Sequence, residues 1–203
     1  DSTGGVSANG GEEFRNGFTA GPVEIQNGYT VTVENGASWF LLGGEDNDVG
    51  EGQVMQVRYA ETPPSRYLIR SANLTAIPNL EVTIQPSHTS SKILLMAMIN
   101  GSFRHVSSFG FLRNNSILTR NLNGNSNVSS GSLATRYSGD DTDGHMNNVH
   151  LQYMDHPNTT NPLTYTVGAA ASWSGSTRNL YINDRDSQDM RSISTLIAME
   201  IRG

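Results

Sequence analysis

The stretch Ser138 to Pro157, SGDDTDGHMNNVHLQYMDHP, gathers residue types that bind metals or transfer protons. Its histidines include His150 and His156, which are six positions apart and separated by the end of a predicted strand. That spacing fits neither the i, i+4 pair of a helical zinc site nor a strand pair with a third ligand nearby. We therefore interpret these histidines as part of a strand and of the turn that ends it.

Acidic runs are the better candidates for a metal site. Several carboxylates beside a glycine turn, as in Asp140, Asp141, Asp143 and Gly144, suit calcium, which takes about six to eight oxygen ligands. However, the spacing differs from the EF-hand pattern, and no glutamate closes the loop. Because Asp-Gly is also ordinary turn chemistry, the sequence favours a solvated loop. The same interpretation covers two further groups: Glu45, Asp46 and Asp48, and Asp184, Asp186 and Asp189.

Sequence patterns of known catalytic sites are absent. There is no G-x-S-x-G elbow, no phosphate-binding glycine loop and no H-E-x-x-H. The chain has no cysteine to act as a nucleophile or thiolate ligand. Paired carboxylates for glycoside cleavage would have to be brought together by the fold, and nothing in the sequence singles out a pair. We predict no enzymatic activity, no cofactor, and no catalytic or metal-binding residues.

The charge balance argues against nucleic acid as a partner. The net charge is −6 and the pI is near 5.3, with no basic cluster, whereas a protein that binds phosphate backbones needs a basic face. No apolar run approaches the roughly 20 residues that cross a bilayer, and no signal peptide is present, so we expect no membrane insertion. The chain begins at Asp1 rather than methionine, which indicates a processed or trimmed start.

The composition and periodicity favour strands joined by loops. The 203 residues include 21 glycines and many Asn, Ser and Thr, and no amphipathic helix of useful length is visible. Apolar residues alternate with polar ones at Leu80 to Ile84 and at Val149 to Met154. The apolar run from Lys92 to Phe103 predicts a strand covered on both faces, and Phe109 to Leu118 predicts a hairpin. We predict an all-β fold, an antiparallel β-sandwich of the jelly-roll type.

Three regions are predicted along the chain. Residues 1–21 are polar and glycine-rich, which is typical of an extended arm that is ordered only where something holds it. Residues 22–52 contain short alternating strands, with turns at Asn27-Gly28 and Asn35-Gly36, and end in a hinge. Such a β-hairpin stem packs either on the larger domain or on the same segment of neighbouring chains. Residues 53–203 form the predicted β-sandwich head domain.

Several segments, in order, resemble a domain of tailed phages, notably phages of marine and freshwater bacteria, including cyanophages. The resemblance covers about residues 70–203 and rests on NLEVTIQPSHTSSKILLMAMINGSF, FGFLRNNSILTR, HLQYMDHPNTTNPLTYTV, RNLYINDRD and ISTLIAMEIRG. The earlier QNGYTVTVENGASWFLL is similar to repeated strands that precede such heads in fibres. The chain differs from the common pattern at Asn183-Asp184-Arg185 and in its polar loop 121–132.

The resemblance implies a homotrimeric head, similar to the C1q and tumour-necrosis-factor jelly rolls, on an intertwined stem. It implies a virion location, as a tail fibre or spike or as a head fibre or capsid decoration protein. Other virion proteins would bind the N-terminal segment, and loops would be free to bind a host-surface glycan or protein. We expect the closing strand, Ser192 to Ile201, near the three-fold axis because both its faces are apolar.

The alternative function is a carbohydrate-binding module without catalytic activity. Such a module would present exposed aromatic residues, for example Trp173, Tyr137 or Tyr181, on one face of a sheet.

Overall fold

The structure is a computed structural model, and it describes residues 16–20, 38–42, 51–103, 105–118, 128–138, 145–173, 176–185 and 190–203. The chain divides into two compact units, Asp1–Gly50 and Glu51–Gly203. Within the described ranges every regular element is a strand. Accordingly, no described helix is long and apolar enough to cross a membrane.

The first unit contains two short strands, β1 (Asn16–Ala20) and β2 (Ser38–Leu42). They pair in parallel, with Asn16 opposite Ser38. β2 lies where the alternation predicts a strand, whereas β1 lies in the predicted extended arm. The predicted strands around Val23 to Val33, with both Asn-Gly turns, lie outside the described residues.

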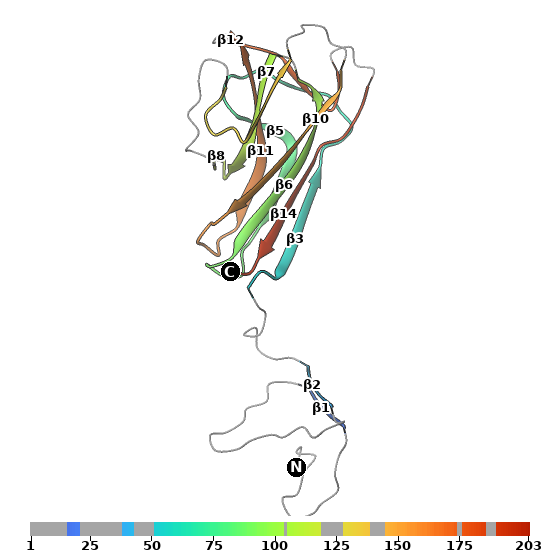
Figure 1. Cartoon of the computed structure of the whole chain (residues 1–203), viewed down its shortest axis with the longest axis vertical. Coiled ribbons are helices and arrows are strands. Elements are labelled where there is room, and N and C mark those ends of the chain that lie inside the picture. The colour runs from blue at the N-terminus through green and yellow to red at the C-terminus, as the bar shows by residue number, and fades with distance from the viewer. Residues whose placement is uncertain are drawn as a thin grey trace, which may run out of the picture. The chain divides into compact units, whose positions relative to one another are not determined.

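The second unit, which we call the head, is built of two antiparallel sheets (Figure 1). The first sheet has the order β10–β6–β14–β3, with β13 and β4 continuing the positions of β14 and β3 at one end. Its strands are β3 (Val54–Glu61), β4 (Tyr67–Ile69), β6 (Lys92–Ser102), β10 (Asn147–Asp155), β13 (Leu180–Ile182) and β14 (Thr195–Ile201).

The second sheet has the order β5–β11–β7–β9, with β12 on the β5 side and β8 on the β9 side. Its strands are β5 (Thr75–Ile84), β7 (His105–Arg113), β8 (Ser116–Ile117), β9 (Ala134–Ser138), β11 (Leu163–Trp173) and β12 (Ser176–Thr177). The eight long strands can be numbered in chain order from 1 to 8 as β3, β5, β6, β7, β9, β10, β11 and β14. The first sheet then has the order 1-8-3-6 and the second sheet the order 2-7-4-5. This is the double Greek key of a jelly roll, so the predicted β-sandwich is confirmed.

Alternating side chains of the two sheets fill the space between them. In β6 the core side chains are Ile93, Leu95, Ala97 and Ile99, and each of their neighbours along the strand points the other way. The rings of Phe103 and Phe109 lie 4.9 Å apart, tilted by 59°. Each fully buried side chain of this size stabilises the fold by roughly 1.5–3 kcal/mol, so this core holds the sandwich together.

The predicted hairpin after Phe109 is present. Asn114 and Asn115 have φ of 48° and 63°, the left-handed values that a two-residue hairpin turn needs and that asparagine tolerates. The Asn114 side chain also accepts a hydrogen bond of 2.9 Å from the backbone N–H of Thr164, which anchors the turn on β11. The turn is thus determined both by its own residues and by its neighbour in the sheet.

Candidate functional site

The opening histidines lie on an edge strand and on the turn after it. On β10, Val149, Leu151 and Tyr153 face the core and His150 faces outward, as predicted. His156 follows the strand and is exposed. Across the described ranges, no three His, Cys, Asp or Glu side chains lie close enough together to hold a metal ion. The predicted strand and turn are confirmed, and the absence of a metal-binding role stays a prediction.

Most acidic candidates lie outside the described residues: Glu45, Asp46, Asp48, Asp140, Asp141, Asp143, Asp186 and Asp189. Asp184 is described, and its side chain is fully buried. Its Oδ1 accepts a hydrogen bond of 2.8 Å from the Arg185 backbone N–H, and its Oδ2 lies 3.1 Å from Arg191 Nε, an ion pair without hydrogen-bond alignment. An arginine therefore occupies the position that a cation would need.

The aromatic residues proposed for sugar binding do not share a face. Tyr137 is exposed on β9 of the second sheet. Tyr181 lies on β13 of the first sheet and is 4% exposed, with the Arg66 guanidinium 4.5 Å from its ring centroid. The Trp173 side chain lies outside the described residues. The carbohydrate-binding alternative would be supported by exposed aromatic residues on one sheet face, but the fold assigns Tyr137 and Tyr181 to different sheets.

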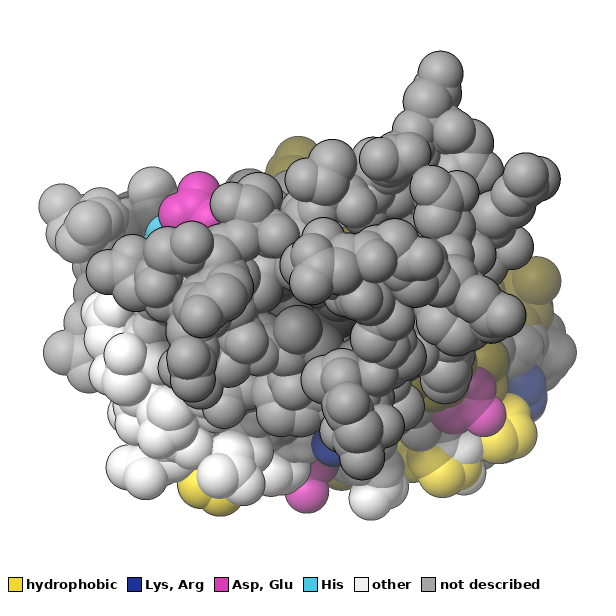
Figure 2. Space-filling view, turned by 90° about the horizontal axis from the view of Figure 1, so that it is seen from below, with side chains coloured by type: hydrophobic (Ala, Val, Ile, Leu, Met, Phe, Trp, Pro, Cys, Tyr) yellow, Lys and Arg dark blue, Asp and Glu magenta, His cyan; other side chains and the backbone are white. Residues whose placement is uncertain are grey.

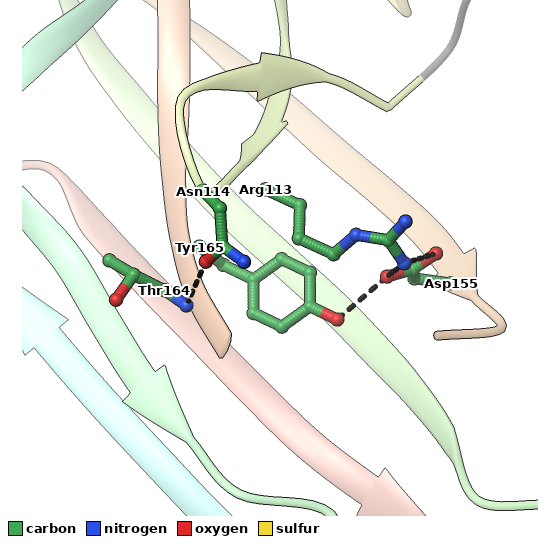
Figure 3. A network of polar contacts seen from close by, with 5 residues as sticks. All are labelled: Arg113, Asn114, Asp155, Thr164 and Tyr165. Atoms are coloured by element: carbon green, nitrogen blue, oxygen red, sulfur yellow. Dashed lines mark hydrogen bonds and ion pairs between the residues drawn. The ribbon is translucent and has the colours of Figure 1, made fainter. Parts of the chain in front are cut away.

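Asp155, at the end of β10, is buried in a polar cluster (Figure 3). Arg113 Nη1 donates to both carboxylate oxygens, at 3.1 and 2.8 Å, and the Tyr165 hydroxyl donates to Oδ2 at 2.6 Å. Burial raises the pKa of Tyr165, and the hydrogen bond to Asp155 raises it further, so the hydroxyl keeps its proton. The cluster ties the edge strand β10 to β7 and β11 of the other sheet. Sequence reasoning missed it because its members are far apart in the chain.

Glu200 is a second buried carboxylate, on the core side of β14. Its oxygens accept hydrogen bonds of 2.6 Å from the Ser87 N–H, the Ser87 hydroxyl and Gln56 Nε2, and one of 2.7 Å from the Ser91 hydroxyl. Burial raises the pKa of Glu200, but the hydrogen bonds outweigh burial and lower the pKa below its usual value. The charged residue among apolar ones on that strand was the sequence signal for this anchor.

Asn183 forms a third buried polar cluster, where β13 leads toward β14. Its Nδ2 donates to Thr62 Oγ1 at 2.6 Å, and its Oδ1 accepts from the Ser194 hydroxyl at 2.7 Å. Asn183 has φ of 64°, so its backbone also matches this residue type. The departure from the phage pattern at 183–185 therefore begins in a buried cluster, and Asn183 and Asp184 are unavailable for receptor contact.

The outward surface of the first sheet differs from these clusters, because no described residue covers its large apolar side chains. We call this surface the outer face. Its residues form three rows across β3, β14, β6 and β10. Each row contains the four residues that are opposite one another in the strand register. Row one is Val57, Met199, Leu94 and Met154. Row two is Tyr59, Ile197, Met96 and Gln152, and row three is Glu61, Thr195, Met98 and His150.

Four side chains of the outer face have large exposed fractions, similar to those of Leu68 and Met190 elsewhere on the head. They are 49% for Val57, 55% for Tyr59, 37% for Met96 and 38% for Met154. In Figure 2, hydrophobic side chains gather at one side of the described part of the head, beside basic and acidic ones. Monomeric proteins rarely expose apolar patches larger than a few hundred Å², and larger patches mark interaction sites. Methionine suits such a site because its flexible side chain adapts to a partner.

Part of the outward surface of the second sheet, around Gly110 and Gly168, is covered by the chain itself. Gly110 and Gly168 are opposite each other in β7 and β11, and without side chains they leave room for Leu74. Ser129 Oγ accepts a hydrogen bond of 3.1 Å from the Leu74 N–H. Gly131 lies directly over Gly110, where an added Cβ would meet the Gly131 carbonyl oxygen at 2.7 Å. The described end of the loop, 128–132, is therefore part of the fold.

A shallow hollow of about 460 Å³ lies beside this cover, lined by Asn115, Ser116, Ile117, Ser130 and Gly131. None of these side chains is titratable, so the described lining residues supply no acid or base. Among the described surfaces, the outer face is the one whose composition lacks an explanation within a single chain. No protein-family model matches this sequence, and no curated protein matches it either.

Proposed function

We propose that this chain is a non-enzymatic structural protein of a virion surface, whose head assembles as a homotrimer through the outer face. The observation that supports the proposal is the apolar row of Val57, Met199, Leu94 and Met154, whose two ends, Val57 and Met154, are 49% and 38% exposed. Burying apolar surface against further copies of the chain would remove it from water at roughly 25 cal/mol per Å². The proposed assembly thus supplies a cover that the described part of the chain does not provide.

The position of β14 supports an axis near the closing strand. β14 lies between β3 and β6, in the interior of the sheet, so Ile197 and Met199 occupy the middle of the outer face. Their core-side neighbours Leu196 and Ala198 are fully buried. A strand with apolar residues on both faces gains most from burial on both faces. We therefore place the outward side of β14 closest to the axis of the trimer.

The strand directions support a display role for the head. β3 begins and β14 ends at one end of the sandwich, where Val54 is opposite Ile201. At the other end β3 and β6 finish and β10 and β14 begin. Asp1–Gly50 would attach to other virion proteins, and the loops of the far end would be free to contact a host-surface glycan or protein. Loops on a rigid scaffold commonly have this role.

A tail fibre or spike and a head fibre or capsid decoration protein both fit this arrangement. The polar clusters around Asp155, Glu200 and Asn183 favour a non-enzymatic role, since their hydrogen bonds are made within the fold. A glycan-binding module is the weaker proposal, because Tyr181 is buried and only Tyr137 of the two described candidates is exposed.

Three measurements test the proposal. Native mass spectrometry of the full chain should give a mass of three chains, and imaging of labelled protein should find it on the surface of particles. Mild peroxide oxidation should modify Met96 and Met154 slowly compared with Met190, which is 46% exposed but lies outside the outer face. A monomer in which all three methionines react alike would contradict the trimer.

A further inference from the structure

We infer that neighbouring copies of the chain meet with their strands parallel to a shared rotation axis, so that Glu61 of one copy lies against His150 of the next. This inference rests on the proposed self-assembly through the outer face. It goes further by stating how the faces are aligned and which side chains meet.

The argument begins from the two edges of the outer face. β3 and β10 are its edge strands, and each row of the face ends in one residue from each. Row one ends in Val57 and Met154, which are both apolar. Row three ends in Glu61 and His150, an acid and a base. Within each of these two rows, the residue on the β3 edge therefore suits the residue on the β10 edge: apolar with apolar in row one, and acid with base in row three.

Rotation about an axis parallel to the strands preserves this match. Such a rotation keeps every row at its own height and brings the β3 edge of one copy toward the β10 edge of the next. Rotation about an axis across the strands would instead reverse the heights. Glu61 would then face apolar rows, which offer its carboxylate no partner. The charge pattern thus selects the parallel alignment.

The surroundings of Glu61 and His150 agree with this pairing. Glu61 accepts a hydrogen bond of 2.7 Å from the Tyr59 hydroxyl, which leaves its other oxygen available. The same hydrogen bond raises the pKa of Tyr59 above its ordinary value, and burial and the Glu61 charge act in the same direction. His150 is opposite Met98, and its outward neighbours along the described β10 are Asn148 and Gln152, so no acid of its own face adjoins it. A ring N–H of His150 can therefore donate to Glu61 of another copy.

Introduced cysteines can test the alignment, because the chain has none of its own. Within one copy, positions 61 and 150 are separated by β14 and β6, so their Cα atoms are roughly 14 Å apart at about 4.8 Å per strand. A disulfide needs Cα atoms within about 7 Å, so this pair can form one only between copies. Full-length Glu61→Cys/His150→Cys should therefore oxidise to covalently linked chains, with three chains as the largest species.

The matched control is Glu61→Cys/Met154→Cys. Position 154 is on the same edge strand but two rows away, about 13 Å along the strand at roughly 3.3 Å per residue. We expect the control to cross-link at least tenfold more slowly than the 61/150 pair. Each single-cysteine variant should form no species larger than two chains.

The outcomes separate the inference from the proposed function. A native trimer in which the 61/150 pair reacts no faster than the control would overturn the alignment and leave the trimer standing. Rapid cross-linking that stops at two chains would support the alignment and contradict the trimer. A protein that stays monomeric and does not cross-link would overturn both.

Discussion

The two outward surfaces of the sandwich differ in whether residues of the same chain cover them. On the second sheet, paired Gly110 and Gly168 make a recess, and Leu74 from the same chain fills it under the 128–132 segment. On the first sheet, the corresponding surface carries large side chains such as Tyr59 and Met96, and no described residue covers them. Small residues therefore accompany a cover from within the chain, whereas large apolar residues accompany a surface left for another molecule.

This difference teaches that the jelly roll alone does not determine which sheet takes part in assembly. Both sheets contribute to the shared core, and each has one register shift in its hydrogen-bonded ladders, at Glu200/Ile201 in the first sheet and at Thr166/Gly168 in the second. What separates them is the volume of the outward side chains and the cover that Leu74 and residues 128–132 provide over the second sheet. Substitutions on the two surfaces should therefore have separable effects on assembly and on folding.

Ile197→Glu should have the largest effect, because it places a charge in the middle of the outer face. The free chain would solvate the new carboxylate, whereas the trimer would bury it without a partner, at a cost of roughly 3–5 kcal/mol. We expect the affinity between copies to fall by about 100-fold or more, with little change in thermal stability of the single chain. Analytical ultracentrifugation over a concentration series measures this change.

The control for Ile197→Glu is Thr83→Glu, an exposed position on the second sheet. Equal dissociation of both variants would show that added charge, rather than its location, disrupts the assembly.

Gly110→Ala should act on folding instead of assembly. The added Cβ would lie 2.7 Å from the Gly131 carbonyl oxygen and 2.9 Å from Leu74 Cδ1, so the cover must shift. We expect the free energy of unfolding to fall by about 1–3 kcal/mol, as for other overpacked sites. Urea denaturation measures it, with the exposed Glu81→Ala of the same sheet as the neutral control. An unchanged midpoint would mean that the 128–132 segment does not hold Leu74 in place.

Glu200→Gln should change the dependence of stability on pH. Glu200 lies on the core side of β14, and the other side of this strand belongs to the outer face. Since its folded pKa is lowered, Glu200 stabilises the fold above the unfolded value near 4.5, and this contribution is lost as pH falls through the lower folded pKa. The variant should be less stable than the parent by about 2 kcal/mol at pH 7, the typical worth of hydrogen bonds to a charged group.

At about pH 3 the difference between Glu200→Gln and the parent should shrink, as the parent approaches its own protonated form. Urea denaturation at both pH values checks this expectation. A deficit of equal size at both would show that lost packing, rather than lost charge, explains the variant.

Charge reversal at the edges of the outer face should have the smallest effect. Glu61→Lys places a cation against His150 of the next copy, and we expect affinity to fall by about two- to fivefold, since ion pairs at an exposed rim contribute up to about 1 kcal/mol. Adding His150→Glu should restore most of the loss. If the double variant lost as much affinity between copies as the two single variants lose together, residues 61 and 150 would not be in contact.

The covered surface of the second sheet determines which part of the loop 121–132 can be exchanged in a test of its role. Exchanging the whole of 121–132 would also remove the buried Ser129 and Ser132, which help hold Leu74 over the second sheet. Exchange of 121–127 alone, with 128–132 retained, should leave the head folded and assembled, as judged by thermal melting and native mass. Loss of folding would place part of the 121–127 segment in the cover as well.

The sequence alone determined the elements whose signal is local. Alternation in Val149 to Met154 predicted which side chains of β10 face the core, and Asn114-Asn115 predicted the turn between β7 and β8. The apolar residues on both sides of β14 likewise marked the closing strand before its neighbours were known. Such features depend on the period of side chains and on backbone preferences of single residues, so they can be recognised without knowing the partner strand.

Only the tertiary structure decided how distant strands combine. The sequence predicted a β6 covered on both faces, yet in the single chain its outward Leu94, Met96 and Met98 lie on the uncovered outer face. Tyr181, a candidate only under the carbohydrate-binding alternative, is buried, and the partners of Asp155 come from β7 and β11. Strand order and register are set by contacts between residues far apart in the chain, and an amphipathic period shows that a face is apolar without showing what covers it.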